Sequence, residues 1–405
     1  MATIALLGTM DTKGSEYGWI RRRLEALGCA VVVINCGVFE PTIPVEVAAA
    51  ELATAAGTSL DALRSSGDRG QAMIAMTRGA GGVLSRLQSE GRIDGVLALG
   101  GSGGSSVAGG AMQVLPVGFP KLLVSTMASG DVSPYVGTAD VTLMYSVVDV
   151  AGINRISRRI LGNAAAAIAG MVGQPADADE EAERPLVAIT MFGVTTAGAN
   201  AARERLEKLG YEVVVFHATG SGGRAMEGLV KGGFFAGVLD LTTTELADEL
   251  VGGVLSAGPD RLEAAGKAGV PQVVSLGAMD MVNFGPRATL PAQFESRNIH
   301  VHNETVTLMR TTPDEMGQLG RIVGEKLARA GSPTSMFVPL RGVSAIDVDG
   351  APFRDVAADE VMFSALRAAL SGSAVRLVEM DNAINDPAFA VAVAEELHRL
   401  ITARD

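Results

Sequence analysis

The sequence predicts an α/β protein of two related Rossmann-like parallel-sheet subdomains, with a ligand cleft between them. Three observations predict this fold. A strand–helix–strand pattern occurs twice, its strands are short continuous apolar runs, and an acidic segment bounded by prolines separates the two copies. Continuous apolar strands are typical of parallel sheets that helices cover on both faces. The 405 residues are enough for two or three domains, each with its own hydrophobic core.

The two strand–helix–strand copies correspond in the order of their segments and in their glycines. The first copy has an apolar strand at residues 3–7 and a helix that Gly28 closes before the next strand. The other copy begins with a strand at residues 186–189, and Gly210 closes its helix. Glycine is common directly after a helix because it adopts the left-handed conformation without a steric penalty. Each copy therefore predicts a βαβ unit.

The correspondence continues beyond these units. Residues 94–99 and 236–241 are matching strands, each followed by a loop of small or hydroxyl-bearing residues. Residues 120–124 and 271–275 form a further matching pair of strands. Four equivalent segments in the same order indicate an internal duplication.

The predicted domain boundaries follow the change in composition. Residues 1–173 form the first Rossmann-like subdomain, residues 174–185 an acidic linker, and residues 186–405 the second subdomain. The last part of the second subdomain predicts a strand at residues 374–379 and a helix that begins at Pro387. This segment either completes the second sheet or crosses back to the first.

The composition argues against nucleic-acid binding. The chain carries 33 Lys and Arg against 45 Asp and Glu, a net charge of −12, so it repels phosphate backbones. One Trp and four Tyr leave few rings on which bases could stack. A small phosphorylated molecule is still compatible with this charge, because backbone amides can bind it locally.

The hydropathy does not indicate a membrane protein. The mean hydropathy is +0.29, but the longest apolar stretch, residues 160–173, is shorter than the ~20 residues that a spanning helix needs. Cys29 and Cys36 match no metal-binding spacing, and the N-terminus resembles a strand more than a secretory leader. We therefore expect a cytoplasmic protein with reduced cysteines.

Two strand-end loops of the first subdomain carry the pattern of a phosphate site. Residues 8–14 combine a carboxylate, two hydroxyls and an ammonium, which suits a phosphate and its magnesium ion, although the spacing is not that of a Walker A loop. Residues 100–106 contain four glycines and three serines, which let backbone amides approach an anion closely. The alternatives are a capped helix for the first loop and a tight turn for the second. The candidate binding residues are Gly8, Thr9, Asp11, Thr12, Lys13, Gly101, Ser102, Gly103, Gly104 and Ser105, with Asp11 as the candidate magnesium ligand.

The second subdomain offers candidates for acid–base chemistry. His217 lies at the mouth of another glycine-rich loop, and Asp240 and Glu245 enclose a run of threonines after a strand. His302 follows in a segment with Arg310, and Asp280 and Asn283 lie at another strand end, where they could line the same cleft. The candidate catalytic residues are His217, Asp240, Glu245 and His302. Each also has a structural interpretation, as a helix cap or a hydrogen-bonded core residue.

Taken together, these loops resemble one family: the ATP-binding N-terminal domain of the plant inhibitor of tomato mosaic virus replication, with its uncharacterised bacterial relatives. The resemblance extends along nearly the whole chain in order. It is carried by the motifs at residues 8–16, 99–105, 240–245, 277–284, 302–312, 339–344 and 385–387. Glu304 and Ala383 depart from the pattern, which has proline and histidine at these positions.

The resemblance implies ATP binding with Mg²⁺, a two-subdomain Rossmann-like fold and a homodimer. In plants this domain is fused to a TIM barrel, so a separate TIM-barrel protein is an expected partner. We therefore expect a nucleotide-binding protein whose phosphates lie on residues 8–14 and 100–106. One alternative is an enzyme that acts on a small carboxylated or phosphorylated metabolite in the cleft between the subdomains. Another is an interaction protein with a structural nucleotide.

Overall fold

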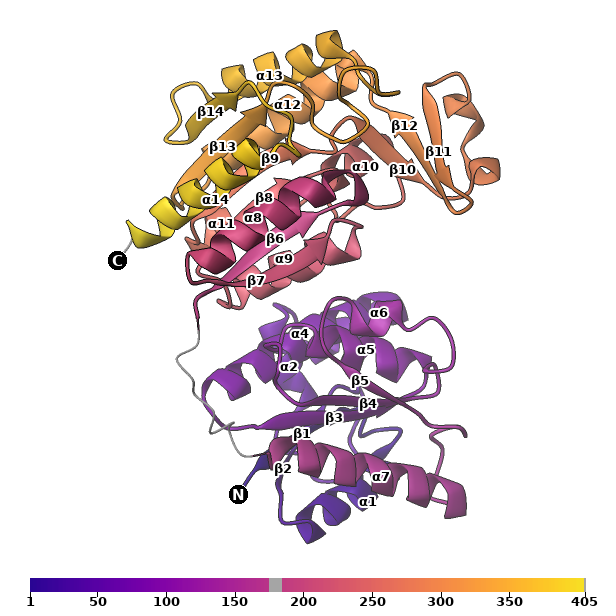
Figure 1. Cartoon of the computed structure of the whole chain (residues 1–405). Helices are drawn as coiled ribbons and strands as arrows, with labels where there is room; N and C mark the ends of the chain where they lie inside the picture. Colours follow the sequence, from indigo (N-terminus) through magenta and orange to yellow (C-terminus); the bar gives the residue numbers. More distant parts are fainter. Residues whose placement is uncertain (175–183, 404–405) are drawn as a thin grey trace. The chain divides into compact units, whose positions relative to one another are not determined.

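The computed structural model describes residues 1–174 and 184–403, which form two compact units (Figure 1). The division between the units falls at residues 180 and 181. The expected linker, residues 174–185, lies mostly outside the described residues.

The first unit is built on a five-stranded parallel sheet with the strand order β2-β1-β3-β4-β5. Its strands are β1 (Thr3–Gly8), β2 (Ala30–Asn35), β3 (Gly95–Gly100), β4 (Lys121–Ser125) and β5 (Thr142–Tyr145). Its helices are α1 (Gly14–Ala26), α2 (Ala49–Ala55), α3 (Leu60–Ser66), α4 (Arg69–Ser89), α5 (Ser102–Met112), α6 (Ser133–Val136) and α7 (Arg155–Val172).

Helices cover both faces of this sheet (Figure 1). Along β1, Ile4 and Leu6 pack into the core formed with α1 and α7. Ala5 and Leu7 point the other way and pack with α2, α4 and α5. Because both faces are buried, residues 4–7 of the strand are all apolar, which is the pattern that predicted a parallel sheet.

The second unit contains a six-stranded sheet and a small three-stranded antiparallel sheet. The six-stranded sheet is parallel and has the order β14-β13-β9-β8-β6-β7. Its strands are β6 (Leu186–Met191), β7 (Glu212–His217), β8 (Gly237–Thr242), β9 (Gln272–Gly277), β13 (Thr334–Pro339) and β14 (Arg376–Met380). The small sheet has the order β10-β12-β11, with β10 (Met281–Phe284), β11 (Ile299–Asn303) and β12 (Val306–Arg310). The sequence analysis did not predict this antiparallel sheet.

The C-terminal segment of the chain belongs to the second unit. The helices of this unit are α8 (Thr196–Lys208), α9 (Ser221–Lys231), α10 (Glu245–Val251), α11 (Ala264–Ala268), α12 (Pro313–Ala328), α13 (Val356–Leu370) and α14 (Pro387–Thr402), with short 3₁₀ turns at 193–195, 287–289 and 292–294. β14 pairs in parallel with β13, and α14 packs into a core with residues of β6 and β8. The segment therefore completes the second sheet.

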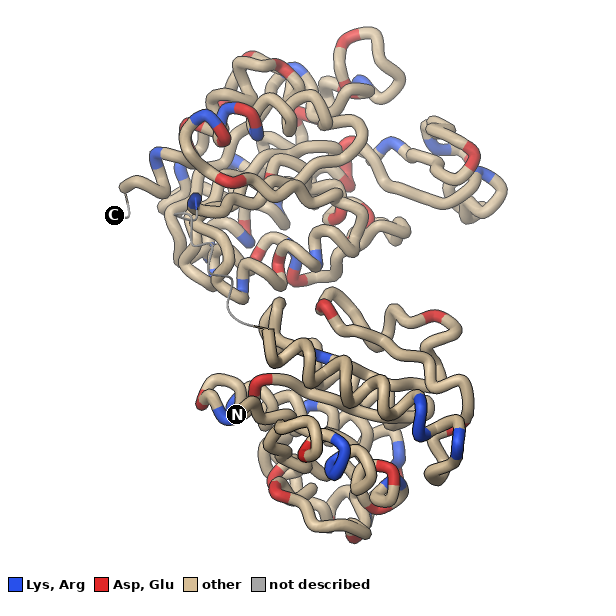
Figure 2. The backbone as a smooth tube through the Cα atoms, turned by 60° about the horizontal axis from the view of Figure 1, so that its bottom comes forward, with Lys and Arg blue, Asp and Glu red and all other residues tan. Residues whose placement is uncertain are grey.

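The charges are divided unequally along the chain. Over residues 1–174, 13 Lys and Arg balance 13 Asp and Glu. Residues 184–403 carry 19 basic against 26 acidic residues, and residues 175–183 add five acidic ones. Figure 2 shows the charged positions on the backbone of both units. No helix in the described part of the chain is long and apolar enough to span a membrane.

Candidate functional site

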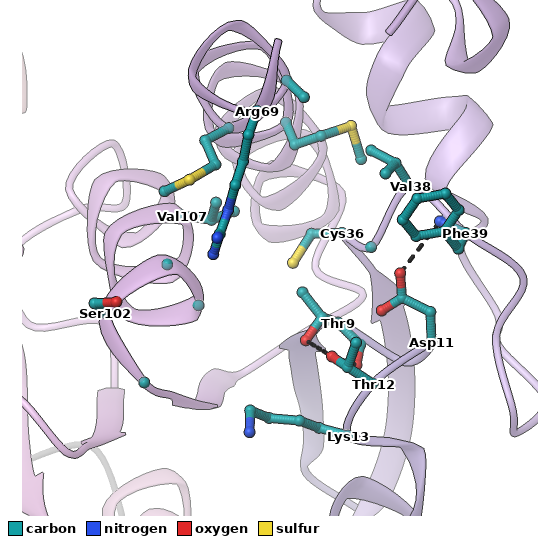
Figure 3. A pocket seen from close by; sticks show the side chains of 17 residues that line it. Thr9, Asp11, Thr12, Lys13, Cys36, Val38, Phe39, Arg69, Ser102 and Val107 are labelled. Atoms are coloured by element: carbon teal, nitrogen blue, oxygen red, sulfur yellow. Dashed lines mark hydrogen bonds between the residues drawn. The ribbon is translucent and has the colours of Figure 1, made fainter. Parts of the chain in front are cut away.

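The first unit has a pocket of about 460 Å³ at the carboxyl edge of its sheet (Figure 3). Three segments that follow neighbouring strands line it: residues 9–13 after β1, residues 36–39 after β2 and residues 101–104 after β3. The first two turns of α4 and of α5 complete the lining. Ligands of open parallel sheets bind at this edge, where strands end and helices begin.

The pocket brings together the two loops that the sequence singled out. Eight of the ten candidate binding residues line it: Thr9, Asp11, Thr12, Lys13, Gly101, Ser102, Gly103 and Gly104. Gly8 and Ser105 do not. A Cβ on Gly8 would lie 2.0 Å from the Tyr17 hydroxyl, so this glycine is required for packing. Ser105 is buried, and its hydroxyl lies 2.6 Å from the Ser125 hydroxyl.

The start of α5 presents backbone amides to the pocket. The first hydrogen bond within this helix runs from Ser105 N to Gly101 O (2.8 Å), so the amides of residues 102–104 have no acceptor within the helix. No side chain caps this end of α5. Residues 102–106, which we expected to form a loop, are therefore the first turn of a helix. Its free N–H groups and partial positive charge favour an anion.

The segment after β1 forms a compact turn at the start of α1. Lys13 N donates to Thr9 O (2.9 Å), and the hydroxyls of Thr9 and Thr12 lie 2.8 Å apart. The Lys13 ammonium donates to the carbonyl of Val150, which holds the positive charge at the rim of the pocket. This turn therefore contributes two hydroxyls and one cation to the site.

Asp11 connects the segments after β1 and β2. Its Oδ2 accepts a hydrogen bond from Phe39 N (3.2 Å), as Figure 3 shows. Its Oδ1 is buried and has no hydrogen-bond partner among the described residues. A Cβ on Gly37 would lie 2.4 Å from this oxygen, so the backbone of the next segment packs closely against the carboxylate. The orphaned oxygen can accept from a bound water or a metal-bound water.

Arg69 is a pocket residue that the sequence analysis missed. It is the first residue of α4, and its side chain extends into the pocket (Figure 3). No ion pair holds it within the described residues, and a Cβ on Gly103 would lie 3.2 Å from its Nη2. Arg69 lies in a helix between β2 and β3, away from any strand end, so no local motif marked it. The two positive charges of Lys13 and Arg69 exceed the single negative charge of Asp11, so the side chains that line the pocket carry a net positive charge.

The other side of the pocket is apolar. Val38, Phe39, Met73, Met76 and Val107 line it. The thiol of Cys36 also faces the pocket, and burial raises the pKa of this thiol to about 12, so it remains protonated. One pocket thus combines a cationic, amide-rich side with an apolar side.

In the second unit, two of the candidate catalytic carboxylates belong to a buried ion-pair cluster. Arg261 is fully buried; its Nη2 donates to Asp240 Oδ1 (2.7 Å) and its Nε to Glu245 Oε2 (2.6 Å). Glu227 lies 3.4 Å from the same guanidinium and accepts from the amides of Leu262 and Ala264. Asp240 and Glu245 are therefore engaged by an arginine that the sequence analysis did not identify.

Glu245 also occupies the second glycine-rich turn, at the start of α9. Its Oε1 accepts from Gly220 N (2.6 Å) and Gly223 N (3.1 Å). The carboxylate thus lies where an external phosphate would lie in an anion-binding turn. His217, just before this turn, stacks on the Phe192 ring with 5.4 Å between ring centres.

His302 does not join this group. It lies on β11 of the small sheet and is exposed. No hydrogen bond or ion pair among the described residues connects it with His217, Asp240 or Glu245. The part of the chain that the structure describes also contains no group of three or more His, Cys, Asp or Glu placed to hold a metal ion.

Comparisons with known proteins match the whole chain. Residues 2–177 match the model of the N-terminal domain, and residues 184–401 that of the C-terminal domain, of an "Uncharacterised protein family (UPF0261)". A UPF0261 protein of Clostridium tetani is 51% identical over 395 residues, which cover 97% of this chain and 98% of that protein. The ToMV resistance protein Tm-1(GCR237) of Solanum lycopersicum is 46% identical over 332 residues, which cover 81% of this chain and 44% of the tomato protein.

A solved structure described as "S. aureus MnaA-UDP co-structure" aligns with 68% of this chain and 79% of its own. The identity is 10% and the TM-score 0.20, which is too low to support an argument about this protein.

Proposed function

We propose that this chain, which belongs to the UPF0261 family and matches both its N- and C-terminal domains, binds a nucleotide, ATP with Mg²⁺, in its first unit. The observation that carries this proposal is the composition of one pocket. The free amides at the start of α5 line the same pocket as Lys13 and Arg69. Helix N-termini with nearby cations are the usual environment of bound phosphates.

The polar side of the pocket would hold the phosphates. The amides of residues 102–104 supply N–H donors, and Lys13 and Arg69 supply charged donors. A hydrogen bond to a charged group contributes about 1.5–3 kcal/mol. The first unit has no net charge over residues 1–174, so the net charge of −12 comes from residues outside the unit that builds this site.

Asp11 is the residue that fits the magnesium ion. Mg²⁺ keeps several waters and is bound through one or two carboxylates together with the substrate's phosphates. The buried Oδ1 of Asp11, which has no described partner, would accept from such a water. The ion would neutralise charge on the phosphates and orient them.

The apolar side would hold the nucleoside. The Phe39 ring is 64% exposed and offers a face on which a base can stack. Met73 and Met76 are flexible and adapt to the shape of the ligand. The volume of about 460 Å³ lies within the usual range of pockets for small molecules.

Titration calorimetry with Mg-ATP tests the proposal. We expect saturable binding to the wild type and affinities about 10–100-fold lower for Lys13→Ala and for Arg69→Ala, because each variant removes a charged donor. Arg92→Ala is the matched control, since Arg92 is an exposed arginine of the same unit outside the pocket. Absence of binding by the wild type, or unchanged affinity in both pocket variants, would refute the proposal.

A further inference from the structure

A second buried cluster of charges lies in the second unit, away from the proposed nucleotide site. It consists of Asp280 in the turn after β9, Asp347 in the loop after β13, Asp359 on α13, Arg310 on β12 and Arg354 just before α13. Asp280 and Asp347 are completely buried, and Asp359 is almost so. The sequence had indicated Asp280 as a residue that could line a cleft and Arg310 as a candidate for hydrogen bonding to a substrate.

Asp359 is fully paired within this cluster. Its Oδ1 accepts from Arg310 Nη2 (2.7 Å), and its Oδ2 accepts from Arg354 Nη1 (2.7 Å). A proton on Asp359 would displace one of these arginines. Burial and the charge of Asp347 raise the pKa of Asp359 to about 7. Because both of its oxygens already accept from guanidinium groups, we place the proton of the cluster on Asp280 or Asp347, each of which has an oxygen without a described partner.

Asp280 and Asp347 each have one satisfied and one orphaned oxygen. Asp280 Oδ2 accepts from the Ser344 hydroxyl (2.8 Å), and Asp347 Oδ2 accepts from Val343 N (3.0 Å). The Oδ1 atoms of both residues are buried without a hydrogen-bond partner among the described residues. The nearest cations to Asp347 Oδ1, on Arg310 and Arg354, are 3.8 Å away, beyond hydrogen-bond distance.

The charges of the cluster do not balance. Three carboxylates face two guanidinium groups, and Asp349, which also contacts Arg354, is 83% exposed and therefore solvated. An uncompensated buried charge is costly, and in proteins such a group usually takes up a proton. A single proton on one of the two orphaned oxygens would remove the excess negative charge.

We propose that Asp280 and Asp347 share one proton and so form a pH-sensitive joint between the turn after β9 and the loop after β13. A proton on the Oδ1 of either residue would neutralise that carboxylate and remove its repulsion of the other. The same two segments are joined by the hydrogen bond from Ala278 N to Val343 O (2.8 Å). The proposal does not depend on nucleotide binding in the first unit.

The electrostatics give the direction of the pH dependence. Burial raises the pKa of Asp280 to about 6, and burial together with the charge of Asp280 raises the pKa of Asp347 to about 6. An unfolded aspartate has a pKa near 3.8. The proton therefore stabilises the folded state fully below about pH 4, and this stabilisation is lost as the pH rises through about 6.

Thermal unfolding of the full chain between pH 5 and pH 8 tests the proposal with Asp347→Asn and Asp280→Asn. An asparagine is neutral at any pH, so either substitution removes the excess negative charge without the proton. From pH 5 to pH 8 the wild type loses the stabilisation that the proton gives, and the variants do not. We therefore expect the difference in melting temperature, variant minus wild type, to increase by about 3–6 °C across this interval. Asp349 is an exposed neighbour on the same loop, and the melting temperature of Asp349→Asn should have the same pH dependence as that of the wild type.

Two further readouts separate a shared proton from other causes. Infrared spectroscopy at pH 5.5 should show a protonated-carboxyl band in the wild type that is lost in Asp347→Asn. Mg²⁺ or Ca²⁺ alone should not change the melting temperature of this unit. The proposal is overturned if both variants keep the pH dependence of the wild type, or if a divalent cation stabilises the wild type but not Asp347→Asn.

Discussion

At the scale of single residues, Arg261 is the centre of a buried ion-pair cluster in the second unit. It is paired with Asp240 and Glu245 and lies 3.4 Å from Glu227. The burial of this guanidinium would be costly alone, but the neighbouring carboxylates raise its pKa well above the usual value. Arg261 is therefore permanently charged and fixes the positions of three carboxylates on different segments.

Replacement of Arg261 should destabilise the second unit strongly. Arg261→Met leaves buried carboxylates without a partner, and removal of one member of a buried ion pair costs about 3–5 kcal/mol. Urea-induced unfolding monitored by circular dichroism measures this loss. Arg203→Ala, which breaks an exposed pair with Glu207, should change stability by less than about 1 kcal/mol. Equal effects of the two substitutions would contradict the assigned role of Arg261.

Some residues of these sites could be predicted from the sequence, and others could not. Lys13 and Asp11 could be identified because they directly follow a strand, where ligand-binding loops are expected. Arg69 and Arg261 could not, because each lies far along the chain from the residues that it meets in the fold. No local pattern encodes such contacts. Asp240 and Glu245 were identified as chemically important, but their arginine partner was not.

At the scale of elements, Tyr17 connects α1 with two neighbouring strands of the first sheet. Its hydroxyl donates to Leu7 O (2.6 Å) and accepts from Leu99 N (2.8 Å), close to the ends of β1 and β3. These are the strands whose following segments form the phosphate side of the pocket. The ring fills the space above Gly8, which explains why this position has no side chain.

Removal of the Tyr17 hydroxyl should loosen this junction. Tyr17→Phe leaves buried backbone groups of both strands without their partner, which costs about 1–3 kcal/mol. Differential scanning fluorimetry without nucleotide should show a lower melting temperature for the first unit. The same substitution at the exposed Tyr145 should have no such effect. An unchanged melting temperature for Tyr17→Phe would mean that the strand ends do not depend on this hydroxyl.

The elements themselves were predicted better than their ends. The βαβ segments, the parallel strands and the final helix could be read from apolar runs and helix-closing glycines. The start of α5 could not, because glycine and serine are typical of loops and disfavour helix interiors. Yet residues 102–106 form its first turn. The small antiparallel sheet was missed because its three strands have four or five residues each and weak patterns.

At the scale of the whole molecule, the two units differ in charge and in the role of their strand-end segments. The first unit is neutral over residues 1–174 and leaves amides, a lysine and an arginine facing a pocket. The second unit is acidic, and its own Glu245, paired with Arg261, accepts from the amides of its glycine-rich turn. The homodimer, the cleft between the subdomains and the TIM-barrel partner stay predictions.

A crystal structure of the full chain with Mg²⁺ and a non-hydrolysable ATP analogue tests the central claim most directly. The account predicts that the phosphates accept hydrogen bonds from the amides of residues 102–104 and contact Lys13 and Arg69, with the base beside Phe39. A nucleotide bound in the second unit, or no nucleotide in the pocket of the first unit at saturating concentration, would contradict it.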